Sequence, residues 1–405
     1  MAVHASPDER PELNEFLASF QVRFRRPEGA DALERYTTGL LTELPHNNGD
    51  TRAQAVPGTR EPRLQACLTT RPWDEADLNR QRVQKLIAEA ILGDGVLVLE
   101  DTGFPKQGKT SVGVARQSSG TLGKVGHCQI AVTCCDPDLH APWPVAGRLS
   151  VPKAWTEAPE RCRKARIPAE VPCQPTPEMA LMRLDQARAW GVPPRGVVAA
   201  ADDGDNPHFL AGLEARQARD VVGVRTDFRV SRQRKASTSG QRADRLRHAL
   251  PRWPWRTMRW RQGVKGWLRK QFVAVRGWRM TSDGRRHAGW LLGERATRGQ
   301  PEERKDFWSN LPTATTVDEL AGYAHRRDAV EPFHEEATGE LGWDQDQGRL
   351  WPGVHRHAVT VMLASSFLVW LELRRRHGQR RRGRPRDPFS PSPGARSDHT
   401  TGGAS

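Results

Sequence analysis

The sequence has little of what marks disulfide-rich, zinc-binding or secreted proteins. Its 405 residues include only six cysteines, and no two of them have the C-x-x-C spacing of a zinc site. We therefore expect reduced thiols in a cytosolic protein. Residues 1–15 are polar and acidic without an apolar core, so we expect no signal peptide.

A long hydrophobic run is also missing. The most apolar segment, residues 358–373, is short for a membrane span and is flanked by basic residues. It predicts a buried helix and no membrane partner. What the chain does have is positive charge: the formal net charge is +15, and 53 of its 63 basic residues are arginine. Because arginine is suited to bidentate phosphate contacts, this composition favours a polyanionic partner.

The most informative stretch runs from Val96 to Thr110. A short apolar run that is typical of a buried strand ends at Glu100 and Asp101, where a Gly/Pro turn follows. The same stretch contains the P-loop pattern G-x-x-x-x-G-K-[ST] at Gly103–Thr110, which needs a helix directly after it. Residues 111–120 are rich in glycine, serine and β-branched residues and form helices poorly. We therefore predict a second strand that folds back on the first, and a third strand over His127–Cys135.

Three pieces of this region resemble a known family. Asp101–Lys106, Ser111–Gln117 and Gly126–Gln129 are similar to the first catalytic block of bacterial insertion-sequence transposases of the DDE superfamily endonuclease type. The similarity extends from about Phe20 to Leu373. The resemblance implies an α/β fold, with a ribonuclease H-like mixed sheet flanked by helices, an N-terminal helical region and a β-rich insertion.

The second block of the resemblance departs from the family pattern. The apolar run Val197–Ala201 predicts a strand, but the family's second aspartate falls on Ala200 when the block is anchored on Gly204–Pro207. Asp202 would point to the same face as Ala200, about 6.6 Å further along an extended strand. A strand slipped by two residues would bring Asp202 into place, whereas Asp203 points to the opposite face.

The third block closes the acidic triad. Glu331 matches the family's glutamate and Arg327 matches its arginine, while Thr338 stands where a lysine is usual. Pro332 is compatible only with the first turn of a helix, so we expect a helix to restart at about Asp328–Glu331. Thr316–Glu319 has the pattern of a capping box that opens the preceding helix.

The resemblance assigns a metal site to three acids. Asp101 is expected to bridge two Mg²⁺ (or Mn²⁺) ions, Asp202 to bind one and Glu331 the other. Two such ions activate the attacking oxygen and stabilise the leaving oxygen of a phosphodiester, so no covalent protein nucleophile is needed. Water would attack first, and the freed 3′-hydroxyl would then attack target DNA.

The expected organisation has five parts. Residues 1–90 form a helical region that helps to bind DNA, 91–215 the first part of the catalytic core, 216–304 a basic, Trp-rich β insertion, 305–373 the second part of the core, and 374–405 a disordered basic tail. Most tryptophans of the insertion are expected to pack within it. DNA contacts are expected from Arg327 and from four arginines of the insertion, which are Arg252, Arg256, Arg259 and Arg261.

Three functions are open at this stage. The first is a transposase that acts on double-stranded DNA, both element terminal repeats and target, as a homodimer located in the cytoplasm at the nucleoid. The second is a catalytically inactive, transposase-derived DNA-binding protein, which the departures at Ala200 and Thr338 favour. The third is a P-loop nucleotidase, which requires a helix after Thr110.

Overall fold

One large sheet organises the chain. The computed structural model describes residues 10–44, 48–89, 95–120, 123–137, 142–200, 204–234, 240–251, 254–263, 266–281, 283–297 and 304–381. Within these residues, ten strands are joined in the order β2-β3-β1-β5-β6-β12-β11-β10-β9, with β4 paired to β3. Their bounds are β1 Val96–Pro105, β2 Ala115–Ser119, β3 Lys124–Asp136, β4 Trp143–Leu149, β5 Gly196–Ala199, β6 Asp220–Val224, β9 Arg256–Gly263, β10 Gly266–Met280, β11 Arg286–Ala296 and β12 Arg304–Ser309.

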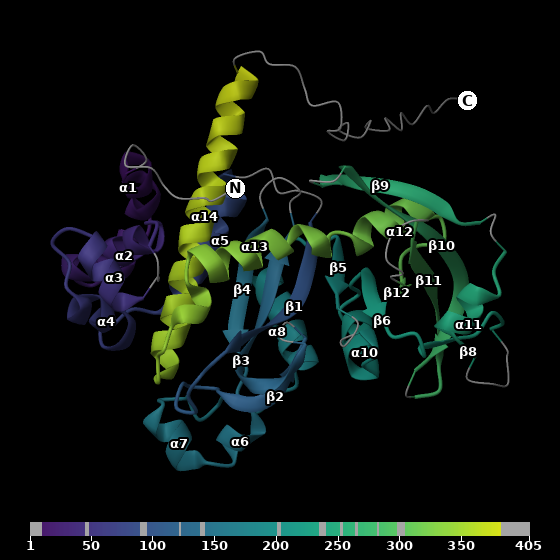
Figure 1. Ribbon diagram of the computed structural model, residues 1–405, viewed down its shortest axis with the longest axis horizontal. Coiled ribbons are helices and arrows are strands. Elements are labelled where there is room, and N and C mark those ends of the chain that lie inside the picture. The colour runs from purple at the N-terminus through teal and green to yellow at the C-terminus, as the bar shows by residue number, and fades with distance from the viewer. Residues whose placement is uncertain are drawn as a thin grey trace, which may run out of the picture.

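The strand directions confirm the predicted fold class. β1 runs parallel to β5, and β5 runs parallel to β6, whereas β3 is antiparallel to β1, β2 and β4. Helices lie on both sides of this mixed sheet (Figure 1). The fold is therefore α/β, with the ribonuclease H-like arrangement that the sequence predicted.

The N-terminal region is helical, as predicted. Its helices are α1 Arg10–Ala18, α2 Pro27–Leu40, α3 Gly49–Ala55, α4 Glu61–Thr69 and α5 Glu75–Glu89, with the short 3-10 helix η2 at Gln21–Arg23. Of these, α1, α2, α4 and α5 pack against the long helix α14 (Trp351–Arg381), which in Figure 1 stands between α1–α4 and β4. Phe16 of α1 contacts Phe367 and Trp370 of α14 at ring-centroid distances of 5.6 and 5.4 Å.

A buried arginine joins this region to the sheet. Arg82 of α5 is 0 % exposed and donates hydrogen bonds to the carbonyl oxygens of Pro144 and Val145 on β4, at 2.7 and 2.8 Å. It also donates to the hydroxyl oxygen of Ser366 on α14 at 2.6 Å. These bonds satisfy a charge that burial would otherwise penalise, so Arg82 connects three elements that are distant in the sequence.

The first strands differ from the prediction in one respect. β2 pairs with β3, through Ala115↔Cys128 to Ser119↔Lys124, and does not fold back on β1. β3 lies between β1 and β2. The reason lies in the segment before β2. Val112 is buried in a cluster with Trp155, and the Trp155 indole N–H donates to the Val114 carbonyl oxygen at 2.8 Å, so this segment is held away from β1. Thr110 is followed by a turn and then by β2, which argues against a P-loop because that loop needs a helix there.

Among the described residues, four helices accompany the core strands. They are α6 Lys153–Thr156, α7 Pro159–Lys164, α8 Thr176–Ala189 and α10 Pro207–Ala215. α8 packs against β1, β3 and β4. Asn206 caps α10, because its side-chain oxygen accepts hydrogen bonds from the backbone N–H groups of His208 and Phe209.

Strands β9 to β12 extend the core sheet beyond β6 and confirm the predicted β-rich insertion. β12 pairs antiparallel with β6 and β11, and the hairpin β7–β8 (Arg229–Val230 and Gln241–Arg242) with α11 (Ala243–His248) lies beside them. Of the tryptophans in this region, Trp255 and Trp308 are buried, in line with a packing role. The side chains of Trp253, Trp260 and Trp267 lie outside the described residues.

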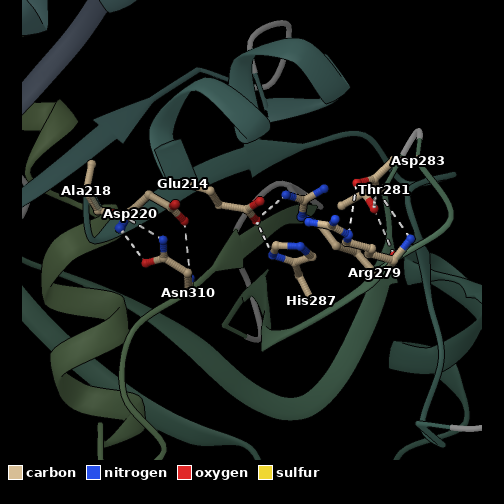
Figure 2. Close-up of polar contacts among 9 residues, drawn as sticks. Glu214, Ala218, Asp220, Arg279, Thr281, Asp283, His287 and Asn310 are labelled. Carbon is tan, nitrogen blue, oxygen red and sulfur yellow. Dashed lines mark hydrogen bonds and ion pairs between the residues drawn. The ribbon is translucent and has the colours of Figure 1, made fainter. Parts of the chain in front are cut away.

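Polar contacts fasten the insertion to the core (Figure 2). Glu214 of α10 pairs with the buried Arg279 of β10 and lies 3.0 Å from Nδ1 of His287 on β11. Asp220 at the start of β6 exchanges hydrogen bonds with Asn310, which follows β12: the Asp220 N–H donates to Asn310 Oδ1 at 2.9 Å, and the Asn310 N–H donates to Asp220 Oδ1 at 3.2 Å.

The elements after β12 confirm the predicted capping box and the predicted helix restart, and the last helix is longer than predicted. They are α12 Val317–Ala324, η3 Arg327–Ala329, α13 Glu331–Glu335, the π-helical turn η4 Glu336–Glu340, η5 Trp343–Gln345 and α14. The capping box at Thr316 is present, and a helix restarts at Glu331 with Pro332 in its first turn. α14 continues to Arg381, past the predicted start of the tail at Arg374, because Arg374 pairs with Glu15 and Arg376 with Glu372. Residues 382–405 lie outside the described residues.

α14 also answers the question of a membrane span. Residues Trp351–Arg376 are long and apolar enough to cross a membrane by length and composition, but 78% of the apolar window is buried inside this protein. Such burial is typical of a core helix, which is what the sequence predicted.

Candidate active site at the carboxyl ends of β1 and β5

Two adjacent acids on β1 belong to opposite faces of the sheet. Side chains alternate along a strand, so Glu100 shares a face with Thr102 and Phe104, and Asp101 lies on the other face. Contacts identify the first face: Thr102 Oγ1 is 3.2 Å from His334 Nδ1 of α13, and the Phe104 ring is 5.4 Å from that of Trp343. The face of Glu100 is therefore the face that α13 covers, and Asp101 is half-buried on the side of α8.

Glu100 is engaged by the third block of the sequence. Arg327 Nε donates to Glu100 Oε1 at 3.0 Å, and Arg327 Nη2 lies 2.5 Å from the same oxygen. The second oxygen, Oε2, is buried without a hydrogen bond and lies 3.7 Å from His334 Nε2. Burial lowers the pKa of His334, so its imidazole is neutral at neutral pH and does not neutralise Glu100.

Glu331 is the exposed first residue of α13. Partial burial of its carboxylate raises its pKa, and the negative charges of Asp328 and Glu100 add to the rise, while Arg327 opposes it. The structure therefore brings Glu331, Arg327 and Glu100 into one electrostatic group. Negative charges crowded in this way favour binding of a cation or a proton.

The second block reaches the same end of the sheet. The parallel pairing of β1 and β5 runs from Val96↔Gly196 to Leu99↔Ala199, so Ala200 follows β5 next to the point where Glu100 and Asp101 follow the paired part of β1. Ala201, Asp202 and Asp203 lie outside the described residues, so Asp202 stays a prediction. Gly204 is required by packing, because a Cβ there would lie 1.9 Å from the carbonyl oxygen of Gly223.

Several other residues of the three blocks have structural partners. Lys106 donates through Nζ to the carbonyl oxygens of Asp344 and Asp346, at 2.6 and 2.7 Å. Asp205 lies 2.7 Å from Nε of Arg225, which ties the second block to the end of β6. Burial lowers the pKa of His357 to about 4, so it is neutral beside the Tyr36 hydroxyl at 2.8 Å.

The donor set only partly fits a pair of divalent cations. Carboxylates are the ligands that Mg²⁺ prefers, and the raised pKa of Glu331 together with the unsatisfied Oε2 of Glu100 marks an environment that a cation would relieve. Among the described residues, however, no group of three His, Cys, Asp or Glu side chains is arranged to hold a metal ion. A further carboxylate is expected from Asp202, which lies outside the described residues.

Comparison with known proteins decides the family. The family profile of DDE superfamily endonucleases matches residues 15–267, which is more than half of the chain. The chain belongs to the DDE superfamily endonucleases. It is also similar to the probable transposase for insertion sequence element IS701 of Microchaete diplosiphon, with 23% identity over 220 residues, which cover 54% of this chain and 55% of that protein. The chain thus spans about half the length of this relative.

The predicted DNA-binding arginines of this chain have different environments. Arg256 and Arg259 are exposed on β9, and Arg256 lies 3.7 Å from Asp318. Arg327 is instead ion-paired with Glu100, a contact that sequence reasoning missed because it joins β1 to a turn 227 positions later. Arg252 and the side chain of Arg261 lie outside the described residues.

Sequence reasoning also missed a cluster that supports α13. His325 lies 2.6 Å from Asp328 Oδ2 through Nδ1 and 3.2 Å from the buried Glu294 Oε2 of β11 through Nε2. Because Asp328 raises the pKa of Glu331, this cluster connects the insertion sheet to the proposed catalytic glutamate. No signal in the sequence marks Glu294, since its partner is 31 positions away.

Proposed function

We propose that this chain is an insertion-sequence transposase that cleaves DNA at element ends and joins the ends to target DNA. The observation that carries the proposal is the meeting of the three sequence blocks at one end of the sheet, within a DDE superfamily endonuclease. The relative named as a transposase supports the same function. We further propose that it acts on double-stranded DNA as a homodimer bound at the nucleoid.

Asp101, Asp202 and Glu331 are the proposed catalytic acids, although Asp101 lies on the face of β1 opposite to the one that α13 covers. Two bound Mg²⁺ or Mn²⁺ ions would supply Lewis-acid chemistry at the phosphodiester. Arg327 forms an ion pair with Glu100, and the negative charges of Asp328 and Glu100 raise the pKa of Glu331. The exposed Arg256 and Arg259 of β9 are proposed to contact DNA phosphates, with Arg252 and Arg261.

Ala200 bears on how active the chain is. It stands at the end of β5, where the family resemblance expects the second aspartate, and an alanine cannot bind a metal ion. We therefore propose low cleavage activity that depends on Asp202. The same observation favours a second candidate function, a catalytically inactive transposase-derived protein that still binds terminal DNA.

The test is a strand-cleavage assay on DNA from the ends of the element, with Mg²⁺ or Mn²⁺ and excess protein. We expect Glu331→Gln to abolish cleavage and to leave DNA binding intact. Glu335→Gln is the matched control, because Glu335 is exposed on the same helix and its substitution removes the same charge. Equal loss in both variants would refute a specific role for Glu331. DNA binding without any cleavage would support the second candidate function.

A further inference from the structure

A cavity on the face of α8 is not used by the proposed catalytic acids. It has a volume of about 350 Å³ and lies between β4, α5, α8 and the start of α14. Segment 168–174 forms part of its rim. Pockets that bind small ligands have volumes of about 300–1,000 Å³, so this cavity can hold one molecule of modest size.

Two arginines line the cavity, Arg148 and Arg183. Arg183 of α8 is 7% exposed; its Nη1 donates to Gln186 Oε1 at 2.6 Å, but its Nε is buried without a hydrogen bond. Arg148 of β4 lies with its guanidinium carbon 5.5 Å from the centre of the Trp351 ring. Neither guanidinium forms an ion pair with any residue that the structure describes.

The charges around the two arginines act on them in both directions. Burial lowers the pKa of each arginine, and the charge of Arg148 lowers that of Arg183 further. The neighbouring His355 is neutral, because burial lowers its pKa to about 4. Glu75 and Glu170 also line the cavity, and their charges raise the pKa of Arg148, but neither forms an ion pair with it. Arginine pairs of this kind bind phosphate oxygens well.

The remaining walls suit more than an inorganic anion. Met179, Met182 and Trp190 line the cavity, so part of any ligand that fills it meets apolar side chains. Met182 is 39% exposed, which is unusual for a methionine on a helix that is otherwise packed on the sheet. A phosphate group alone would leave this apolar surface uncovered, whereas the sugar and base of a nucleotide would cover it.

The cavity also lies close to the first catalytic block. Asp101 is the cross-strand partner of Val132, and Val132 is the partner of Arg148, so all three side chains share one face of the sheet. Two strand spacings separate Asp101 from Arg148, which is about 10 Å. This distance is short enough for one DNA strand to contact both residues.

We propose that this cavity binds a single nucleotide through its phosphate, which Arg148 and Arg183 hold, while its sugar and base lie against Met179, Met182 and Trp190. In the transposase function proposed above, on which this part of the inference rests, the nucleotide is the terminal residue of a DNA strand. A free nucleoside monophosphate has the same chemistry and is the other source of the ligand.

Calorimetric titration of the full-length protein tests the proposal. The probes are thymidine 5′-monophosphate, thymidine, inorganic phosphate, and a short single-stranded oligonucleotide with or without a 5′-phosphate, all in the absence of divalent metal. We expect binding of the monophosphate or the phosphorylated oligonucleotide, at least about tenfold tighter than binding of thymidine or of phosphate alone. Binding of the phosphorylated oligonucleotide alone would identify a strand end as the ligand. Binding of the monophosphate alone would identify a free nucleotide.

Two variants and one control make the test specific. Arg148→Met removes one phosphate contact, and Ala76→Trp fills the mouth of the cavity from α5 without changing its charge. Each should weaken binding at least about tenfold. Arg163→Met removes the same charge from an exposed position, where the side chain is 77% exposed, and should leave binding unchanged. Circular dichroism verifies that each variant is folded.

Equal binding by all four proteins, or no binding of any phosphorylated probe, would overturn the inference. Its failure is distinguishable from failure of the proposed function, because these titrations need neither metal nor cleavage. Metal-dependent cleavage without nucleotide binding would refute the proposed nucleotide site and retain the proposed function. Binding of the monophosphate in a protein that binds no DNA would refute the role in transposition and retain the nucleotide site.

Discussion

Replacing Asp220 by asparagine should stabilise the protein at alkaline pH. Asp220 is 2% exposed at the junction between β6 and β12, where its oxygen accepts the backbone N–H of Asn310 (Figure 2). Burial raises the pKa of Asp220 from 3.8 to about 7, although Asn310 and Arg279 favour the charged form. Asparagine keeps the acceptor oxygen for Asn310 and never ionises.

The magnitude and sign follow from the pKa. A rise from 3.8 to about 7 corresponds to about 4 kcal/mol, at about 1.36 kcal/mol per pKa unit. Because the folded state holds the proton more tightly than the unfolded state, the stabilising contribution is fully present below pH 4. It is lost as the pH rises to about 7. The original protein therefore carries the full penalty of the buried charge at pH 8, and Asp220→Asn does not.

Urea denaturation followed by tryptophan fluorescence measures the effect at about pH 3.5 and pH 8. We expect Asp220→Asn to be more stable than the original protein by about 1–4 kcal/mol at pH 8, and nearly equal to it at the lower pH. Asp283→Asn is the control, because Asp283 is exposed and hydrogen bonds from Thr281 and Arg285 lower its pKa. The free energy of unfolding of this variant should therefore change little at pH 8, and any change should be a loss of stability. An Asp220→Asn protein that is less stable by the same amount at both pH values would refute the reasoning.

Three further predictions concern DNA. Asp101→Asn should abolish metal-dependent cleavage of element-end DNA and keep DNA binding in a gel-shift assay; full retention of cleavage would remove Asp101 from the site. Glu100→Gln should shift the acid limb of the cleavage pH profile to lower pH, because the charge of Glu100 raises the pKa of Glu331; a shift to higher pH would contradict this. DNA affinity should fall at least about tenfold between about 50 and 200 mM salt, as for any protein that neutralises several phosphates; a binding curve indifferent to salt would contradict a phosphate-binding role of the arginines.

Local patterns predicted much of the fold. The capping box at Thr316 and the helix that restarts at Glu331 were readable because each depends on residues a few positions apart. Strand positions were readable from apolar runs for the same reason. The order of β2 and β3 was not, since it depends on contacts of Val112 and of the Val114 carbonyl oxygen with Trp155, about 40 residues further on.

The site was predictable in outline and not in detail. The blocks around Asp101 and Glu331 could be found from the sequence, but the pairing of Glu100 with Arg327 could not, because it depends on which face of β1 α13 covers. Charge on a helix usually indicates a solvated surface, yet Arg82 is fully buried with three polar partners from β4 and α14. Long-range partners of this kind leave no periodic signal in the sequence.

Restoring an aspartate at position 200 tests the central claim most directly. Cleavage of element-end DNA is measured for the original protein, Ala200→Asp and Asp202→Ala, each with Mg²⁺ or Mn²⁺. If the chain is a metal-dependent endonuclease, we expect weak cleavage by the original protein and none by Asp202→Ala. Cleavage by Ala200→Asp should be at least about tenfold faster, because an acid then stands at the end of β5. Strong cleavage by the original protein that neither substitution changes would contradict it.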